Sequence, residues 1–232
     1  MSGQIPLELR LDARLDFSGF YPGGNGETVA ALMRCAEGGG DAFLFLWGPQ
    51  GHGKTHLLHA AGGRAGEYGR TAVCLPLGDF ARLDPAMLDG IEAYDLVCLD
   101  DVDAIAGDVA WEEALLHGFN RLRQMERQLI VASSVSPNQL PIALPDLRSR
   151  LAWGMALRLQ ALDDAGKLAV LTGRARHLGL ELPVAVGQYL LARCPRDLPT
   201  LWALLDRLDQ SSLAARRPLT IPFVKTLLGD KA

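Results

Sequence analysis

An α/β fold with a parallel β-sheet between helices, followed by a small all-helical subdomain, is the fold class that the sequence predicts. Three observations carry this prediction. Four continuous apolar runs alternate with segments of helical periodicity, which is typical of parallel strands buried on both faces. A glycine-rich loop directly follows the first run, as in nucleotide-binding α/β folds. After about residue 160, only helical periodicity remains.

The predicted elements follow one another along the chain in that order. Strands are expected at 42–47, 71–77, 95–99 and 128–133, with a fifth candidate at 155–159. A turn-rich segment at 21–26 leads into a helix over 30–36, which three glycines at 38–40 stop. Further helices are expected at 164–177, 184–193, 198–215 and 221–228. We therefore expect an extended segment at 1–16, an α/β core at 17–161 and a helical subdomain at 162–232.

Length and composition fit one core of this kind with an added subdomain. The 232 residues are 49% hydrophobic, enough for a large core. The net charge of −4 argues against a bulk attraction to nucleic acid, and no concentrated basic cluster stands out. The four cysteines show neither a metal-binding nor a disulfide pattern. No stretch is apolar enough for a signal peptide or a membrane span. We expect a reduced, cytoplasmic protein that is not attached to a membrane.

The loop after the first predicted strand carries the clearest chemistry. Residues 48–55 read G-P-Q-G-H-G-K-T and fit the phosphate-binding pattern G-x-x-x-x-G-K-[ST] in its strand–loop–helix context. Gly48, Gly51 and Gly53 let main-chain N–H groups face phosphate oxygens at a helix N-terminus. Lys54 is expected to neutralise the β- and γ-phosphates, and the Thr55 hydroxyl to bind Mg²⁺. The predicted ligand is ADP or ATP with Mg²⁺.

Other polar residues near this loop are weaker candidates. His52 and His56 could contact the nucleotide, although solvated or packed side chains are the simpler interpretation. Asp100 follows the third strand, where it could hold Mg²⁺ directly or through water, and Asp101 could orient or deprotonate the attacking water. Alone, two such carboxylates are also an ordinary entry into a loop. Ser134 closes the fourth strand and either contacts a γ-phosphate or water, or caps a turn.

With these elements in order, the chain resembles the DnaA-related AAA+ ATPases, the bacterial replication-initiator family, and is most similar there to the Hda-like regulators. The resemblance runs over nearly the whole chain and implies a AAA+ core with a helical lid. Its most specific segments are L-P-D-L-R-S-R-L-A-W-G at 144–154 and L-T-I-P-F-V-K at 219–225. Segments 20–25, 57–61 and 96–100 also match.

The resemblance implies roles for individual residues. Phe20 and Tyr21 fall where this family holds the adenine, and Ser134 falls at the sensor position on the fourth strand. Arg150 matches the arginine finger, which reaches the nucleotide of a neighbouring subunit. Its planar, permanently charged group suits a transferring phosphoryl group. From the residues alone, an ion pair with Asp146 is the simpler alternative.

Two departures from the family pattern concern the chain's own nucleotide. Pro199 stands where the family's second sensor is an arginine, although Arg196 lies nearly one turn earlier. Ser134 lacks the acidic group of the initiator. Both imply weak turnover and a bound product such as ADP. Asp101 keeps the second carboxylate, so residual hydrolysis stays open.

The first residues resemble a clamp-binding peptide. As a bare pattern, Q-I-P-L-E-L at 4–9 is an ordinary tail. In Hda-like proteins a hexapeptide at this place docks on the DNA polymerase III sliding clamp, which implies contacts through Gln4, Ile5, Leu7 and Leu9. The initiator's DNA-binding domain has no counterpart before Ala232, so we expect no duplex recognition by this chain.

These expectations define a leading function and two alternatives. The leading hypothesis is a negative regulator of DNA replication initiation that binds the sliding clamp and uses Arg150 to promote hydrolysis of DnaA-bound ATP. Such a protein activates the ATPase of its partner, with weak or no turnover of its own. One alternative is an autonomous AAA+ ATPase that loads a helicase or acts as a remodelling factor. Another is a nucleotide-binding scaffold between DnaA and the clamp. Homo-oligomerisation is left open.

Overall fold

A parallel β-sheet forms the centre of the first of two compact units. The computed structural model describes residues 11, 15–78, 83–195, 197–215 and 219–229. The units are Met1–Gln160 and Ala161–Ala232. The strands of the first unit are β1 (Phe43–Trp47), β2 (Ala72–Pro76), β3 (Leu96–Asp100), β4 (Gln128–Ser133) and β5 (Met155–Arg158). Their order is β2-β3-β4-β1-β5, and all neighbours are parallel. This confirms the predicted fold class.

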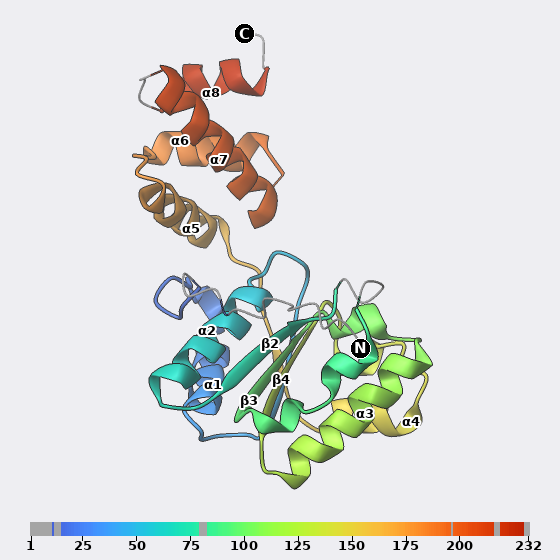
Figure 1. Ribbon diagram of the computed structural model, residues 1–232. Helices are drawn as coiled ribbons and strands as arrows, with labels where there is room; N and C mark the ends of the chain where they lie inside the picture. The colour runs from blue at the N-terminus through green and yellow to red at the C-terminus, as the bar shows by residue number, and fades with distance from the viewer. Residues whose placement is uncertain (1–10, 12–14, 79–82, 196, 216–218, 230–232) are drawn as a thin grey trace, which may run out of the picture. The chain divides into compact units, whose positions relative to one another are not determined.

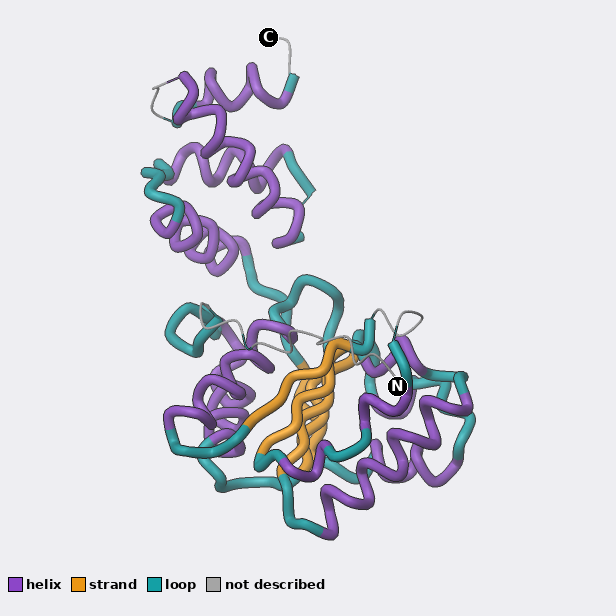
Figure 2. Tube along the Cα trace, in the orientation of Figure 1, coloured by secondary structure: helices purple, strands orange, loops and turns teal. Residues whose placement is uncertain are grey.

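Helices cover both faces of this sheet. They are α1 (Gly26–Ala36), α2 (Lys54–Glu67), α3 (Val109–Gln124) and α4 (Pro145–Leu151). Figure 1 shows α1 and α2 on one side of the strands and α3 and α4 on the other. In Figure 2 the strands form one band between the two groups of helices. Short 3-10 helices join these elements: η1 (Gly23–Asn25), η3 (Pro85–Leu88), η4 (Ile91–Ala93), η5 (Val102–Ile105) and η6 (Pro137–Gln139).

Side chains point alternately to the two faces of the sheet along each strand, and this divides the core of the unit into two apolar clusters. On β1, Phe43 and Phe45 belong to the cluster that includes residues of α3 and α4. Leu44 and Leu46 belong to the other, which includes residues of α1 and α2. Successive side chains of a strand point to opposite faces, so a strand covered on both faces is apolar throughout. The buried cysteines Cys74 and Cys98 lie in the second cluster as ordinary core residues.

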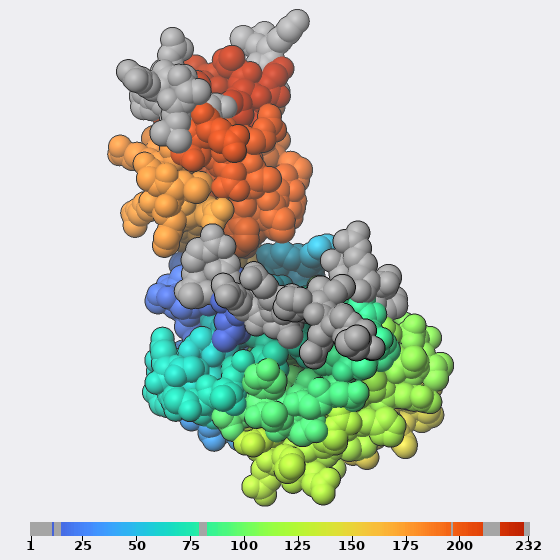
Figure 3. All heavy atoms as spheres, in the orientation of Figure 1, coloured from blue at the N-terminus to red at the C-terminus, as the bar shows by residue number. Residues whose placement is uncertain are grey.

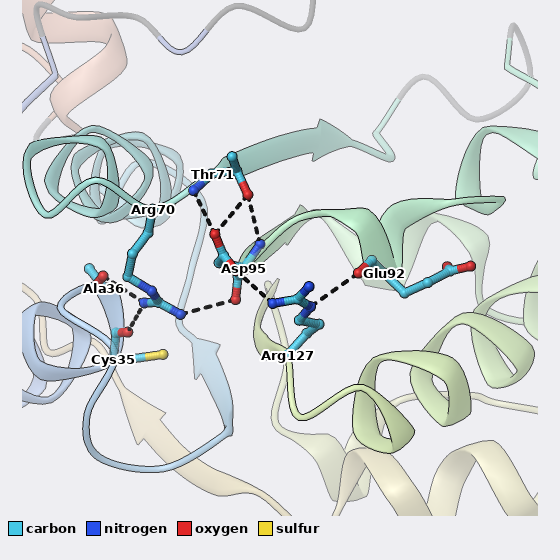
Figure 4. A network of polar contacts seen from close by, with 7 residues as sticks. All are labelled: Cys35, Ala36, Arg70, Thr71, Glu92, Asp95 and Arg127. Atoms are coloured by element: carbon cyan, nitrogen blue, oxygen red, sulfur yellow. Dashed lines mark hydrogen bonds and ion pairs between the residues drawn. The ribbon is translucent and has the colours of Figure 1, made fainter.

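The amino ends of three strands are tied together by charged side chains (Figure 4). Thr71, Asp95 and Arg127 each directly precede a strand. The Asp95 carboxylate accepts hydrogen bonds from the Thr71 N–H and hydroxyl, both at 2.9 Å, and pairs with Arg127 at 2.6 Å. Arg70 donates to the last carbonyls of α1 and to Asp95 O. This network fixes the end of the sheet at which these strands begin, opposite the end that carries the glycine-rich loop.

The second unit is entirely helical in the residues that the structure describes. Its helices are α5 (Asp164–His177), α6 (Val184–Arg193), α7 (Leu198–Ala215) and α8 (Ile221–Leu228), the ranges that periodicity predicts. Each contributes a fully buried residue to one apolar cluster: Leu171, Leu190, Leu205 and Val224.

The start of α7 explains how Pro199 is accommodated. The Asp197 side chain accepts a hydrogen bond from the Thr200 N–H at 2.8 Å, which makes Asp197 the cap of the helix. Hydrogen bonds from Thr200 also hold the pKa of the Asp197 carboxyl below its ordinary value. Pro199 is therefore the second residue of the helix. It still lies in the first turn, where the missing N–H of proline costs no helical hydrogen bond.

Candidate nucleotide-binding site

The glycine-rich loop joins the carboxyl end of β1 to the first turn of α2. The Gly48 N–H donates to the Ser133 carbonyl at 3.2 Å, which ties the loop to the end of β4. Gly51 and Gly53 have φ angles of +79° and +90°. These are left-handed conformations that side chains disfavour. A Cβ on Gly53 would also lie 2.7 Å from Cε2 of Phe20, so both its backbone angle and its surroundings require glycine.

Lys54 is held against the loop that it follows. Its side chain is buried, and its ammonium donates to the carbonyl oxygens of Gly48 at 2.8 Å and Pro49 at 3.3 Å. A lysine at the N-terminus of a helix adds a full positive charge to the partial charge of the helix dipole. The loop thus places a buried cation beside main-chain N–H groups, an arrangement suited to a polyphosphate.

Thr55 and Asp100 bring two oxygen ligands together from different elements. The Thr55 hydroxyl donates to Oδ2 of Asp100 at 2.5 Å, and Asp100 is buried at the end of β3. Hydroxyl and carboxylate oxygens are ligands that Mg²⁺ prefers, with phosphate oxygens and waters supplying the rest. Among the described residues, no group of three or more His, Cys, Asp or Glu side chains could hold a metal ion. Thr55 and Asp100 supply two adjacent oxygen atoms of the kind that Mg²⁺ prefers.

Asp101 has an unusual backbone conformation and a carboxyl group with a raised pKa. Its φ of +52° lies in the left-handed region, which aspartate tolerates better than most residues. Partial burial and the neighbouring charge of Asp100 raise the pKa of the Asp101 carboxyl. A carboxylate with a raised pKa at the end of a strand is suited to accept a proton.

Ser134, for which the resemblance predicts a sensor role, is paired with a carboxylate in the structure. The Ser134 N–H donates to Oδ1 of Asp103 at 3.0 Å, and its hydroxyl donates to Oδ2 of the same carboxylate. Although burial opposes it, these bonds hold the pKa of the Asp103 carboxyl below its ordinary value. The acidic group that Ser134 lacks is thus supplied beside it by η5. Sequence reasoning missed Asp103, for which the third aspartate of D-D-V-D was the available signal.

Aromatic residues from the N-terminal segment pack beside the loop. The Phe20 and His56 rings lie 5.6 Å apart, and His56 Nε2 lies 2.7 Å from the Asp16 carbonyl. Tyr21 is 41% exposed next to them. Phe20 therefore lies beside the loop, as the predicted role with the adenine requires, and Tyr21 is the next residue in the chain. His52 Nδ1 lies 3.3 Å from the Gln50 carbonyl within the loop.

Asn25 fixes the position of this N-terminal segment. Its buried side chain accepts from the Gln160 N–H at 2.7 Å and donates to the Gln160 carbonyl at 3.2 Å. This amide exchanges two hydrogen bonds with the main chain directly after β5, which the sequence analysis did not anticipate. It holds the turn at 21–25 against the end of the sheet that carries the loop.

Arg150 lies far from the loop of its own chain. It belongs to α4, and its guanidinium carbon lies 5.9 Å from the centroid of the Phe119 ring. Phe119 meets Phe43 edge to face at 5.1 Å, at the amino end of β1. The loop begins at the other end of β1, about 13 Å along the strand, and α2 lies on the opposite face. None of the ion pairs within the described residues involves Arg150 or Asp146, and the buried Nε of Arg150 has no acceptor there.

The remaining sequence predictions concern residues that are not described or features of the whole chain. The segment predicted to bind the clamp, with Gln4, Ile5, Leu7 and Leu9, lies outside the described residues, as does Arg196. Among the helices in the described part of the chain, none is long and apolar enough to cross a membrane.

Comparisons with known proteins match both units. Residues 86–158 match the family model of the bacterial DnaA ATPase domain, and residues 164–228 match that of the Hda lid domain. Domain III of the Thermotoga maritima replication initiation protein DnaA superposes with a TM-score of 0.83 at 22% identity, over 95% of this chain and 98% of that chain. The Thermotoga maritima RuvB branch migration motor shares the fold, with a TM-score of 0.67 at 16% identity, over 86% of this chain and 66% of that chain.

Two similar DnaA structures contain nucleotide analogues. AMPPCP-bound DnaA from Aquifex aeolicus has a TM-score of 0.73 at 27% identity, over 85% of this chain and 66% of that chain. A replication initiator DnaA bound to AMPPCP and single-stranded DNA has a TM-score of 0.73 at 25% identity, over 89% of this chain and 69% of that chain. The chain therefore spans about two thirds of the length of these initiators.

The parallel sheet, the phosphate-binding loop and the helical second unit define a AAA+ protein of the P-loop class. The two family matches lie on different units and agree with each other. The chain is a DnaA-related AAA+ protein close to Hda.

Proposed function

We propose that this chain is a regulator of DNA replication initiation that binds an adenine nucleotide and supplies Arg150 to the ATP bound by DnaA. Recruitment to the DNA polymerase III sliding clamp through residues 4–9 is part of the same proposal, as is action in the cytoplasm. Clamp binding would confine the activity to DNA that is being copied. The protein would then lower the amount of ATP-loaded initiator after replication has begun.

The position of Arg150 is the observation that carries this proposal. It lies on the face of the sheet opposite α2 and near the amino end of β1, so it cannot reach phosphates in its own loop. No ion pair in the described residues holds its guanidinium. An arginine placed in this way is suited to a nucleotide on another subunit. There it would stabilise the charge that develops as water attacks the γ-phosphorus and ADP leaves.

The chain's own nucleotide has a different role in this proposal. Lys54 and the loop N–H groups would bind the phosphates of ADP or ATP, with Phe20 and Tyr21 beside the adenine. Thr55 and Asp100 would hold Mg²⁺, which neutralises phosphate charge when it is bound. We propose ADP as the working ligand, with the bound nucleotide stabilising the conformation that docks on DnaA.

The test is single-turnover hydrolysis of DnaA-bound ATP in the presence of this chain and clamp loaded on DNA. Arg150→Ala is expected to lose stimulation by on the order of 10³-fold, and Arg150→Lys to recover little of it because lysine cannot form the planar fork. Arg148→Ala, an exposed arginine on the same helix, is the matched control and should stimulate normally. Equal stimulation by Arg150→Ala and the natural sequence would refute the finger role.

Deletion of residues 1–9 separates the two halves of the proposal. The shortened chain should keep its effect on DnaA at high protein concentration but lose the dependence on clamp. If the deletion leaves clamp dependence intact, the segment is not the clamp-binding element.

A second candidate function is an ATPase that works on its own nucleotide. It is favoured by Asp101, whose raised pKa suits a general base, and by the similar initiator bound to single-stranded DNA. This candidate predicts brisk ATP turnover by the chain alone, stimulated by single-stranded DNA and abolished by Asp101→Asn. Turnover that stays low without DnaA would exclude it.

A further inference from the structure

A fully buried carboxylate lies between the nucleotide site and the helix of Arg150. Glu112 is in the first turn of α3 and is 0% exposed. Its Oε1 accepts hydrogen bonds from the Gly107 N–H at 2.7 Å and the Ala143 N–H at 3.0 Å. Its Oε2 accepts from the Leu144 N–H at 2.8 Å. Burial of a charge is costly unless hydrogen bonds compensate it, and three main-chain donors converge on this one.

Two of these three donors belong to the segment that begins α4. Leu144 is the residue before the helix, and its side chain provides no capping hydrogen bond. The Leu144 carbonyl accepts a hydrogen bond from the Arg148 N–H at 3.0 Å, which is the first main-chain hydrogen bond of the helix that carries Arg150. Ala143 and Leu144 are held by Glu112 rather than by a side chain of their own segment. Glu112 thus holds the main chain directly before α4.

The third donor belongs to the segment that follows the nucleotide-site carboxylates. Gly107 lies two residues after the end of η5, which begins directly after Asp101 and contains Asp103. Asp103 in turn holds the Ser134 N–H and hydroxyl. One side chain thus fixes both the loop after the carboxylates and the start of α4. In Figure 3 the residues of α3 form part of the outer surface of the first unit, whereas Glu112 itself is fully buried.

We propose that Glu112 is a positioning residue for Arg150. By accepting from Ala143 and Leu144, it sets the start of α4 and hence the direction in which the guanidinium is presented to a neighbouring nucleotide. The inference rests on the proposed function of Arg150 for its kinetic consequence, but the effect on α4 can be measured independently. Displacement of a catalytic group by about 1 Å is enough to lower a rate by up to about 100-fold.

Glu112→Gln is the most informative substitution because it preserves size and removes one acceptor. A glutamine oxygen can replace only one carboxylate oxygen, and its NH₂ group then faces a main-chain N–H. Glu113→Gln, the neighbouring exposed position on α3, makes the same change of charge and is the matched control. Circular dichroism and a cooperative thermal transition identify the variant as folded.

Hydrogen exchange tests the positioning without any reference to DnaA. In Glu112→Gln, the amides of residues 143–153 are expected to exchange at least about 10-fold faster, while amides of β1, β3 and β4 keep their protection. Glu113→Gln should match the natural sequence at every amide. If residues 143–153 exchange at the natural rate in folded Glu112→Gln, the proposal is wrong.

The kinetic test distinguishes positioning from a general loss of stability. The maximal stimulated rate of DnaA-bound ATP hydrolysis should fall about 10- to 100-fold in Glu112→Gln. The concentration for half-maximal stimulation should stay within about twofold. An unchanged maximal rate, in a system where stimulation depends on Arg150, would overturn the proposal. If the natural sequence gives no stimulation at all, the proposed function fails, and the exchange result alone decides whether Glu112 holds α4.

Discussion

Replacement of Gly53 by alanine tests the geometry of the phosphate-binding loop without any ligand. Gly53 has a φ of +90°, and a Cβ there would lie 2.7 Å from Cε2 of Phe20. The left-handed backbone costs an alanine about 1–2 kcal/mol. Displacement of the Phe20 ring adds about 1–3 kcal/mol, the usual cost of overpacking. We therefore expect Gly53→Ala to destabilise the first unit by about 2–5 kcal/mol.

A glycine within α2, the helix that Gly53 precedes, provides the matched control. Gly63 is exposed within α2, has no positive φ, and a Cβ there meets nothing within 4 Å. Gly63→Ala is expected to stabilise by about 0.5–1 kcal/mol, because alanine lowers the entropy lost on helix formation. The same chemical change is thus expected to destabilise at the residue before α2 and to stabilise within α2.

Thermal unfolding followed by tryptophan fluorescence measures both effects. Trp47, Trp111 and Trp153 lie in the first unit, so the signal mainly reports its unfolding. With about 2–4 °C per kcal/mol for a protein of this size, Gly53→Ala should lower Tm by about 4–20 °C and Gly63→Ala should raise it by about 1–4 °C. Adding Phe20→Ala should recover the steric part of the Gly53→Ala loss but leave the backbone part. Equal Tm values for the two glycine variants would refute the reasoning.

Three further predictions concern charges. Asp101→Asn should raise Tm at pH 8, since the raised pKa of Asp101 means that its ionised form costs stability. That gain should fade as the pH falls through the folded pKa, and a gain independent of pH would contradict the cause. Asp95→Asn should lower stability by about 1–2 kcal/mol at pH 7, because hydrogen bonds from Thr71 depress the pKa of Asp95. This loss should shrink as the pH falls from 5 to 3, below the ordinary value of 3.8, in urea titrations at each pH. Lys54→Ala should weaken ADP binding by about 10- to 100-fold in calorimetry, and unchanged binding would remove Lys54 from the site.

The elements of the fold could be predicted because each leaves a local pattern. Strands covered on both faces read as continuous apolar runs, as in Phe43–Trp47, and the helices of the second unit read as 3.6-residue periods. The loop at 48–55 could be predicted for the same reason. Its chemistry is contained in eight consecutive residues between a strand and a helix.

The residues that the sequence analysis missed act through partners distant in sequence. Asn25 bonds to Gln160, which lies 135 positions away, and Glu112 reaches segments 5 and 31 to 32 positions away. Asp103 reaches Ser134 across 31 positions. No period or short motif marks such pairs, because the contact exists only after the sheet has formed. The missing acidic group at Ser134 was one reason to expect weak turnover of the chain's own nucleotide. Because Asp103 supplies a carboxylate beside Ser134, that reason no longer holds.

The separation of Arg150 from its own loop likewise needed the fold. A motif can suggest that an arginine is a finger, but the face of the sheet on which it lies depends on how α3 and α4 pack. In the structure that face is opposite α2, and the Phe119–Phe43 contact fixes the end of β1 next to which Arg150 lies. This geometry supports action on a neighbouring nucleotide rather than on the chain's own.

The most direct test of that claim asks which nucleotide is hydrolysed. DnaA carrying γ-labelled ATP is mixed with this chain carrying unlabelled ADP, on DNA with loaded clamp, and release of labelled phosphate is followed over a single turnover. The reverse mixture places the label on this chain and unlabelled nucleotide on DnaA. We predict rapid release only when the label starts on DnaA, and its loss with Arg150→Ala. Release mainly from the label on this chain, or release from DnaA that does not depend on Arg150, would contradict the account.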